Sequence, residues 1–248
     1  MTELTDPHIR EATSAARDLR AQLGISIDEP LNKDILELVE GDLGIPVCVM
    51  EMPEGVAGAY LKKRGQNFIF LQATDFPTRQ RFTLSHEVGH HVLNHKGRVE
   101  DSKDVGGNPV DPNEQQANYF ASEFLHPVEA VKEWLARNAA ESFDLRTLVI
   151  AADDFHVSPP AMLYRLSKGD FGLTRPELDE LWKQVKAKDH VTLAEKLHIW
   201  AGDDELAALE ANKAWPRLPA ALVDNAKAAH AVGFINDQRL DAVLRKSS

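Results

Sequence analysis

The chain has 248 residues, of which 43% are hydrophobic, enough for one large domain or two small ones. Its formal net charge of −11 argues against non-specific attraction to nucleic acid or to an anionic membrane surface. The only cysteine, Cys48, excludes an intrachain disulfide, and the apolar run around it predicts a buried strand thiol.

The first twenty residues are charged and contain no apolar stretch of the kind that signal peptides carry. No apolar run elsewhere approaches the length of a membrane span. We therefore expect a cytoplasmic protein without a membrane anchor.

The N-terminal part predicts two helices followed by a small antiparallel sheet. Apolar spacing predicts helices over 7–23 and 30–40, each followed by a glycine. A hairpin turn is predicted at Arg64-Gly65. The three strand-like runs are 45–50, 56–62 and 67–72.

A largely buried helix is predicted next, with Thr78 as its N-cap, because its apolar residues are not confined to one stripe. Residues 96–108 show no apolar periodicity and predict a loop. Asp111-Pro112-Asn113-Glu114 then starts another helix, with Asp at the N-cap and Pro at the first helical position, and Pro127 ends it.

Only helices are predicted from Val128 onward. Thr174 with Glu177 and Thr192 with Glu195 have the spacing of capping boxes. The predicted helices cover 128–138, 145–154, 159–168, 176–186, 193–201, 205–213, 219–232 and 237–246. The order of elements predicts an α+β fold with an all-helical C-terminal region.

The sequence His86-Glu87-Val88-Gly89-His90 reads H-E-x-x-H, the zincin signature, inside the predicted buried helix. Helical residues four apart share a face and rise by about 6 Å, so both imidazoles can reach one ion. Glu87 lies beside them, where it can take a proton from a water that the metal activates. Zn²⁺ is the expected ion, although such ligands also suit iron or manganese.

A hydrolytic zinc site needs a third protein ligand and one open position. The metzincin continuation is excluded by Leu93 and Lys96, so we expect the carboxylate of Glu114, which follows His90 by 24 residues (90 to 114) and lies one turn into the next helix. A Glu at this place is also an ordinary helix-stabilising choice. The competing carboxylates are Glu100, Asp101, Asp104, Asp111 and Glu123.

A second histidine pair with the same spacing, His91 and His95, is a rival to the first. Val92 stands where that pair would need its acid, so we prefer His86 and His90. The rival pair is expected either beside the site or simply near the helix end. The candidates for stabilising an oxyanion are Tyr60, His91 and Tyr119, and spacing does not choose between them.

These residues, with Glu114-x-x-Ala117-Asn118-x-Phe120-Ala121 and the earlier Gly55-Val56-Ala57-Gly58, resemble the ImmA/IrrE metallo-endopeptidase family. The resemblance covers roughly residues 31–127. It implies that His86, His90 and Glu114 hold zinc and that Glu87 is the catalytic acid/base. One departure is His126-Pro127, where the family usually has Met-Pro, and we expect a small pocket change there.

The resemblance also implies a partner, because family members typically cleave a helix-turn-helix repressor and some are paired with an antitoxin-like regulator. We therefore expect a zinc endopeptidase acting on a regulatory protein, in a setting such as stress response or a toxin–antitoxin pair. The alternatives are a non-hydrolytic zincin-like regulator that binds a repressor or DNA, and a toxin-like hydrolase with another target. The oligomeric state is left open.

Two domains are predicted, a zincin-like metallopeptidase domain over 1–138 and a helical domain over 139–248. The segment 144–168 resembles a helix-turn-helix. Acidic residues outnumber basic ones there, four to three between Asp144 and Asp170, which argues against DNA binding and for a packing or protein-contact role.

Overall fold

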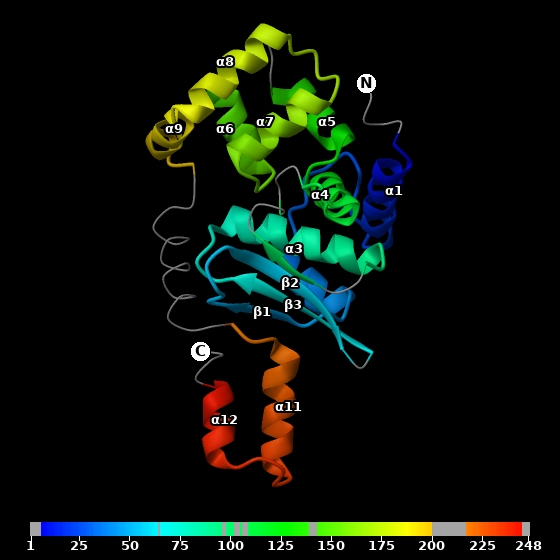
Figure 1. Ribbon diagram of the computed structural model, residues 1–248. Coiled ribbons are helices and arrows are strands. Elements are labelled where there is room, and N and C mark those ends of the chain that lie inside the picture. Colours follow the sequence, from blue (N-terminus) through cyan, green and yellow to red (C-terminus); the bar gives the residue numbers. More distant parts are fainter. Residues whose placement is uncertain are drawn as a thin grey trace. The chain divides into compact units, whose positions relative to one another are not determined.

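The computed structural model describes residues 6–63, 65–95, 98–101, 105, 109–138, 143–199 and 217–244 (Figure 1). The chain forms two compact units: a sheet unit of residues 33–118 and 205–248, and a helical unit of residues 1–32 and 119–204. The α+β class is confirmed. The helix predicted over 205–213 lies outside the described residues, and the domain boundary after residue 138 stays a prediction.

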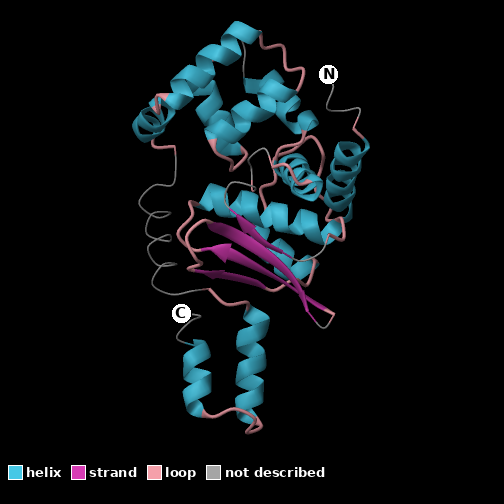
Figure 2. Cartoon of the chain, viewed as in Figure 1, coloured by secondary structure: helices cyan, strands magenta, loops and turns pink. Residues whose placement is uncertain are grey.

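The sheet unit contains a four-stranded sheet in the order β1-β3-β2-β4 (Figure 2). Strands β2 and β3 are antiparallel, and Lys63 pairs with Gln66 across the predicted two-residue turn. Strands β1 and β3 are parallel, so the prediction of a purely antiparallel sheet was wrong. The strands are β1 (Val47–Met50), β2 (Val56–Lys63), β3 (Gln66–Gln72) and β4 (Arg98–Asp101).

Strand β4 lies in the segment predicted as a loop, and it pairs antiparallel with β2. Three of its four residues are charged, so no apolar alternation announces it. Short, charged strands are typical of sheet edges, where charge discourages pairing with other chains. Its pairing with β2 is a long-range contact that local pattern does not encode.

The helix predicted over 30–40 is shorter than expected. Helix α2 (Ile35–Glu37) begins after Asp34, whose carboxylate accepts a hydrogen bond of 2.8 Å from the amide of Leu36. The chain then widens into the π-helical turn η2 (Leu38–Asp42).

Helix α3 (Pro77–Val92) lies across one face of the sheet and carries the histidine motif (Figure 1). Phe76 occupies the N-cap position and Pro77 the first helical position, so the prediction of Thr78 as the cap was wrong. Every residue from Thr83 to His90 is buried, which confirms the expected burial of this helix.

The C-terminus of α3 is closed by Asn94, whose φ of 55° is left-handed. The amide of His95 donates to the carbonyl of His90 at 2.9 Å, and that of Asn94 donates to the carbonyl of His91 at 3.1 Å. This pair of bonds is the Schellman arrangement, which reverses the chain direction after a helix. It folds the residue after Asn94 back onto the last turn of α3.

The helical unit is held in part by Arg20, whose side chain is fully buried. Its guanidinium donates to the carbonyls of Phe124 and Glu29, each at 2.6 Å, and also to that of Ser26. The helical unit contains α1 (Pro7–Gln22), the second half of α4 (Pro112–Leu125), α5 (Val128–Asn138), α6 (Leu145–Asp154), α7 (Pro159–Lys168), α8 (Arg175–Lys186) and α9 (Asp189–Leu197). The first half of α4 belongs to the sheet unit.

The capping box of Thr174 and Glu177 is confirmed at the start of α8. The second predicted capping box was wrong, because α9 begins at Asp189 after the left-handed Lys188, which leaves Thr192 inside the helix.

After the gap in the described residues, Arg217 attaches the C-terminal segment to the free edge of β1. The amide of Val49 donates to its carbonyl at 3.0 Å, and its guanidinium donates to both carboxylate oxygens of Glu40, at 3.1 and 2.7 Å. Helices α11 (Ala220–Ala231) and α12 (Asp237–Leu244) follow as an antiparallel hairpin (Figure 1). Within the described ranges, no helix has the length and apolar content that a membrane span requires.

Candidate metal centre

Helix α3 presents two chemically different faces within the sheet unit. One stripe, at every fourth residue, packs on β2: Thr83 and Glu87 lie against Gly58, and His91 lies against Tyr60. The adjacent stripe carries His86 and His90, which lie against the first half of α4. Because neighbouring helical residues are rotated by about 100°, a single buried helix places the two imidazoles and the carboxylate of Glu87 on adjoining faces.

Three buried side chains, His86, His90 and Glu114, converge between α3 and α4. The Nε2 atom of His86 is 3.0 Å from the Nε2 atom of His90 and 3.2 Å from the Oε2 atom of Glu114. The third separation, from His90 Nε2 to Glu114 Oε2, is 3.5 Å. The predicted convergence of these residues therefore occurs.

These separations match the edges of a metal coordination shell. Ligand atoms at about 2.0–2.1 Å from zinc, arranged tetrahedrally, lie about 3.3 Å from one another. Asn118 Oδ1, 3.0 Å from the Nδ1 atom of His86, can only accept a hydrogen bond, so the proton sits on Nδ1 and the Nε2 lone pair faces the cluster. Lone pairs and a carboxylate at such distances repel one another unless a cation lies between them. The residues present thus fit a metal ion.

Burial also keeps His86 ready to act as a ligand. Desolvation lowers the pKa of His86, and it outweighs the opposing effect of the nearby Glu114 carboxylate. The imidazole is therefore neutral at neutral pH, the state in which histidine binds metal. Desolvation and the neighbouring His90 likewise lower the pKa of His95.

Glu114 reaches the cluster because of how α4 begins. The carboxylate of Asp111 accepts a hydrogen bond of 2.9 Å from the amide of Asn113, and Pro112 opens the helix. The first turn of α4 points Glu114 towards the imidazoles, where its side chain is 1% exposed. Its place near a helix start is compatible with either role predicted for it, but the direction of Oε2 favours that of a ligand.

Glu87 is fully buried between the sheet and the motif helix. A Cβ atom added to Gly58 would lie 2.6 Å from Glu87 Oε1 and 2.6 Å from Thr83 Cγ2. Only glycine therefore leaves room for this carboxylate against β2. In the sequence Gly58 stands out only within the family resemblance, because its role depends on a contact between a strand and a helix.

Of the competing carboxylates, two that the structure describes have other partners: Asp111 caps α4, and Glu123 forms ion pairs. Glu123, in the helical unit, pairs with Arg17 at 2.8 Å and with Arg165 at 3.2 Å. Glu100 and Asp101 lie in β4, with side chains outside the described part, and Asp104 lies outside it altogether. Within the described ranges, His86, His90 and Glu114 are the group of side chains able to share a metal.

The second histidine pair does not form a site of its own. His91 Nδ1 lies 3.1 Å from the hydroxyl of Tyr60, which donates to Asn67 Oδ1 at 2.9 Å. His95 instead lies against His90. Two of the three candidates for stabilising an oxyanion, Tyr60 and His91, are therefore hydrogen-bonded to each other on the sheet side of α3. The role of the third, Tyr119, stays a prediction.

His126 is buried in the helical unit and is not part of the cluster. Its Nδ1–H donates to the carbonyl of Ser122. Desolvation, reinforced by the nearby positive charge of Arg165, lowers the pKa of His126 to about 3, so it is neutral. It is a core side chain of the helical unit, and the pocket change expected at this position stays a prediction.

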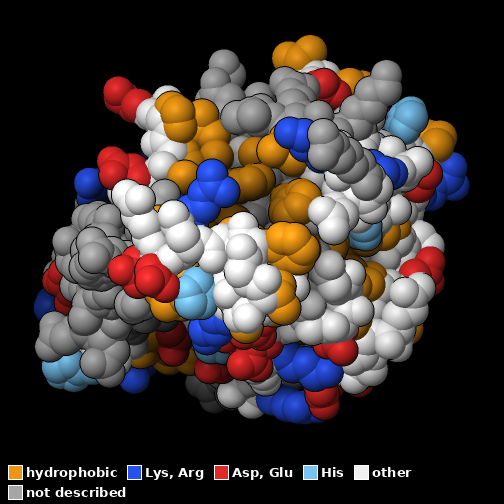
Figure 3. Space-filling model, turned by 90° about the horizontal axis from the view of Figure 1, so that it is seen from below, with side chains coloured by type: hydrophobic (Ala, Val, Ile, Leu, Met, Phe, Trp, Pro, Cys, Tyr) orange, Lys and Arg blue, Asp and Glu red, His pale blue; other side chains and the backbone are white. Residues whose placement is uncertain are grey.

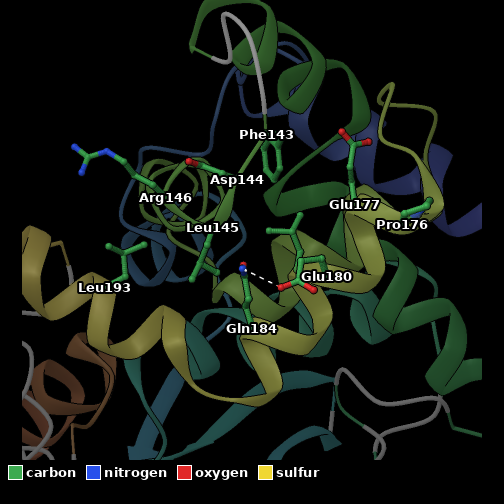
Figure 4. A pocket seen from close by; sticks show the side chains of 10 residues that line it. Phe143, Asp144, Leu145, Arg146, Pro176, Glu177, Glu180, Gln184 and Leu193 are labelled. Carbon is green, nitrogen blue, oxygen red and sulfur yellow. Dashed lines mark hydrogen bonds between the residues drawn. The ribbon is translucent and has the colours of Figure 1, made fainter.

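A separate cavity of about 600 Å³ opens in the helical unit (Figure 4). Its wall is a mixture of apolar, acidic, basic and amide side chains, and along one side of it Gln184 donates to Glu180, four residues earlier on α8, at 3.3 Å. None of the clustered residues lines this cavity. The lining residues are Phe143, Asp144, Leu145, Arg146, Pro176, Glu177, Glu180, Leu181, Gln184 and Leu193.

A buried H-E-x-x-H helix packed on a sheet, with a glutamate from the next helix completing the cluster, defines a zincin-type metallopeptidase domain. The family model described as Peptidase_M78, IrrE N-terminal-like domain, matches residues 40–167, just over half of the chain. The chain belongs to this family. A comparison with curated proteins gave no match.

Proposed function

We propose that this chain is a zinc-dependent endopeptidase and that its substrate is a regulatory protein, such as a helix-turn-helix repressor or an antitoxin-like partner. The convergence of His86 Nε2, His90 Nε2 and Glu114 Oε2 within 3.5 Å is the observation that carries the proposal. Family membership supports a protein substrate. The identity of that substrate follows only from the resemblance.

Zinc held by His86, His90 and Glu114 would supply a Lewis acid that polarises the scissile carbonyl. Glu87 accepts the proton of the attacking water and returns it to the leaving nitrogen. Burial of the site removes competing solvent and strengthens each electrostatic interaction with the reacting groups. The packing of Glu87 against Gly58 fixes the position of the carboxylate that makes this transfer.

Glu87→Gln tests the proposal because glutamine keeps the shape and removes the proton acceptor. The variant should retain about one zinc ion per chain, by elemental analysis, and lose cleavage by about 10²–10⁴-fold. Cleavage is measured by incubating wild type or variant with host-cell extract and with the products of neighbouring genes. Mass spectrometry then identifies new N-termini that depend on Glu87. Equal biological activity of the variant would support a non-hydrolytic regulator instead.

DNA binding is not part of the proposal. On the face shown in Figure 3, basic side chains are interspersed with acidic and apolar ones rather than gathered in one patch. The formal charge of −11 agrees with this distribution. A surface that contacts many phosphates carries a basic excess.

A further inference from the structure

The imidazoles of His90 and His95 lie against each other at the end of α3. Their Nδ1 atoms are 3.0 Å apart, and the His95 Nε2 atom is 3.2 Å from Gln116 Oε1. A hydrogen bond between two ring nitrogens needs one N–H and one lone pair. Because Gln116 Oε1 can only accept, a neutral His95 carries its proton on Nε2 and accepts at Nδ1. His90 then donates Nδ1–H, which leaves its Nε2 lone pair facing Glu114.

We propose that His95 is a positioning residue for the metal, fixing the ring orientation and tautomer of His90, while Gln116 holds His95 in turn. The inference rests on the proposed metal centre. Ligand histidines usually donate their second N–H to a carboxylate, a backbone carbonyl or water. Here the acceptor is a neutral imidazole. Asn118 serves His86 in the equivalent way.

The backbone builds this arrangement locally. The left-handed Asn94 turns the chain back, and the amide of His95 donates to the carbonyl of His90, the residue whose ring it contacts. Gln116, which is 5% exposed, approaches from α4, two residues after Glu114. Gln116 and Asn118 therefore both come from α4, the helix that supplies the proposed third ligand, Glu114. In this way α4 orients both imidazoles in addition to contributing the carboxylate.

The test measures zinc affinity, by competition with a chromogenic chelator, in the purified full chain. His95→Phe removes the acceptor and should raise the Kd for zinc by about 10–100-fold. His95→Asn places an amide oxygen near the position of Nδ1 and should restore most of the affinity. His91→Phe is the matched control, because His91 is a neighbouring imidazole bound to Tyr60, and its Kd should equal that of wild type.

A second readout follows the tautomers directly. Imidazole ¹⁵N spectra of the zinc-loaded wild type should show His90 protonated at Nδ1 and His95 at Nε2. A His95 ring protonated at Nδ1 would overturn the inference, even if His95→Phe fails to fold. An unchanged Kd for zinc in His95→Phe would also overturn the inference, but it would leave the proposed metal centre intact. A wild type that binds no zinc would overturn both the centre and this inference.

Discussion

Gly58→Ala is the substitution that tests Glu87, the proposed catalytic carboxylate, without altering a proposed metal ligand. The new methyl group would lie 2.6 Å from Glu87 Oε1 and from Thr83 Cγ2, and 3.2 Å from the carbonyl oxygen of Phe70. The first two distances are about 1 Å below van der Waals contact. Either α3 moves away from β2 or the Glu87 carboxylate turns aside.

Overpacking of this kind typically costs about 1–3 kcal/mol, so urea unfolding should show a loss of stability in that range. A displacement of about 1 Å in a catalytic group costs on the order of 10²-fold in rate. The cleavage rate of Gly58→Ala should therefore fall by about 10²-fold. Zinc content should be unchanged, because His86 and His90 face α4 rather than β2.

Thr83→Ser in the Gly58→Ala background is the matched control. It removes the Cγ2 methyl group, one of the two closest contacts, and leaves the contact with Glu87. The double variant should regain part of the lost stability without regaining the lost cleavage. Wild-type cleavage and stability in Gly58→Ala would refute the packing of Glu87 against Gly58.

Three further outcomes are expected. Arg20→Met should lower the free energy of unfolding by about 3 kcal/mol, because the buried Arg20 guanidinium donates to three carbonyls, of which the bond to Phe124 is itself buried. Burial lowers the pKa of Arg20 to about 10, so it stays charged at pH 7. An unchanged urea midpoint would contradict this. The pKa of His126 is lowered to about 3 by burial, so between pH 6.5 and 3 the unfolded state binds the extra proton and stability falls as the pH falls. Between pH 7.5 and pH 5 the free energy of unfolding of wild type should fall by about 2 kcal/mol more than that of His126→Met. Equal pH dependence in the two proteins would contradict a buried, neutral His126. Removing zinc with a chelator should lower the Tm of wild type, and less so that of Glu114→Ala.

The histidine motif could be predicted because its geometry is local, and Glu114 because a cap marks the start of its helix. The i, i+4 spacing of His86 and His90 is fixed by the helix itself. The cap at Asp111 sets the start of α4, so the direction of Glu114 follows once α4 returns over α3. The termini of most helices were also predictable where a cap or a proline marks them, as with Thr174 before α8.

The remaining features depend on long-range contacts or on single backbone angles. The parallel pairing of β1 with β3 and the charged strand β4 are set by which strands meet in the sheet. The shifted start of α9 follows from the left-handed Lys188, a conformation that its sequence does not announce. Asparagine and histidine are enriched at positive φ, as at Asn94 and His156, but a lysine such as Lys188 gives no such warning.

The left-handed Asn94 shows why such an angle matters for function. Without the reversal that it makes, the chain after α3 would run on past the helix, and the ring of His95 would not meet that of His90. The sequence left open whether His95 belongs beside the site or only near the helix end, and that choice depends on this one angle. Asn94→Ala, strained at a φ of 55°, should therefore weaken zinc binding as His95→Phe does, although the substituted side chain touches no proposed ligand. An Asn94→Gly variant, which accepts the same φ without strain, should bind zinc as wild type does.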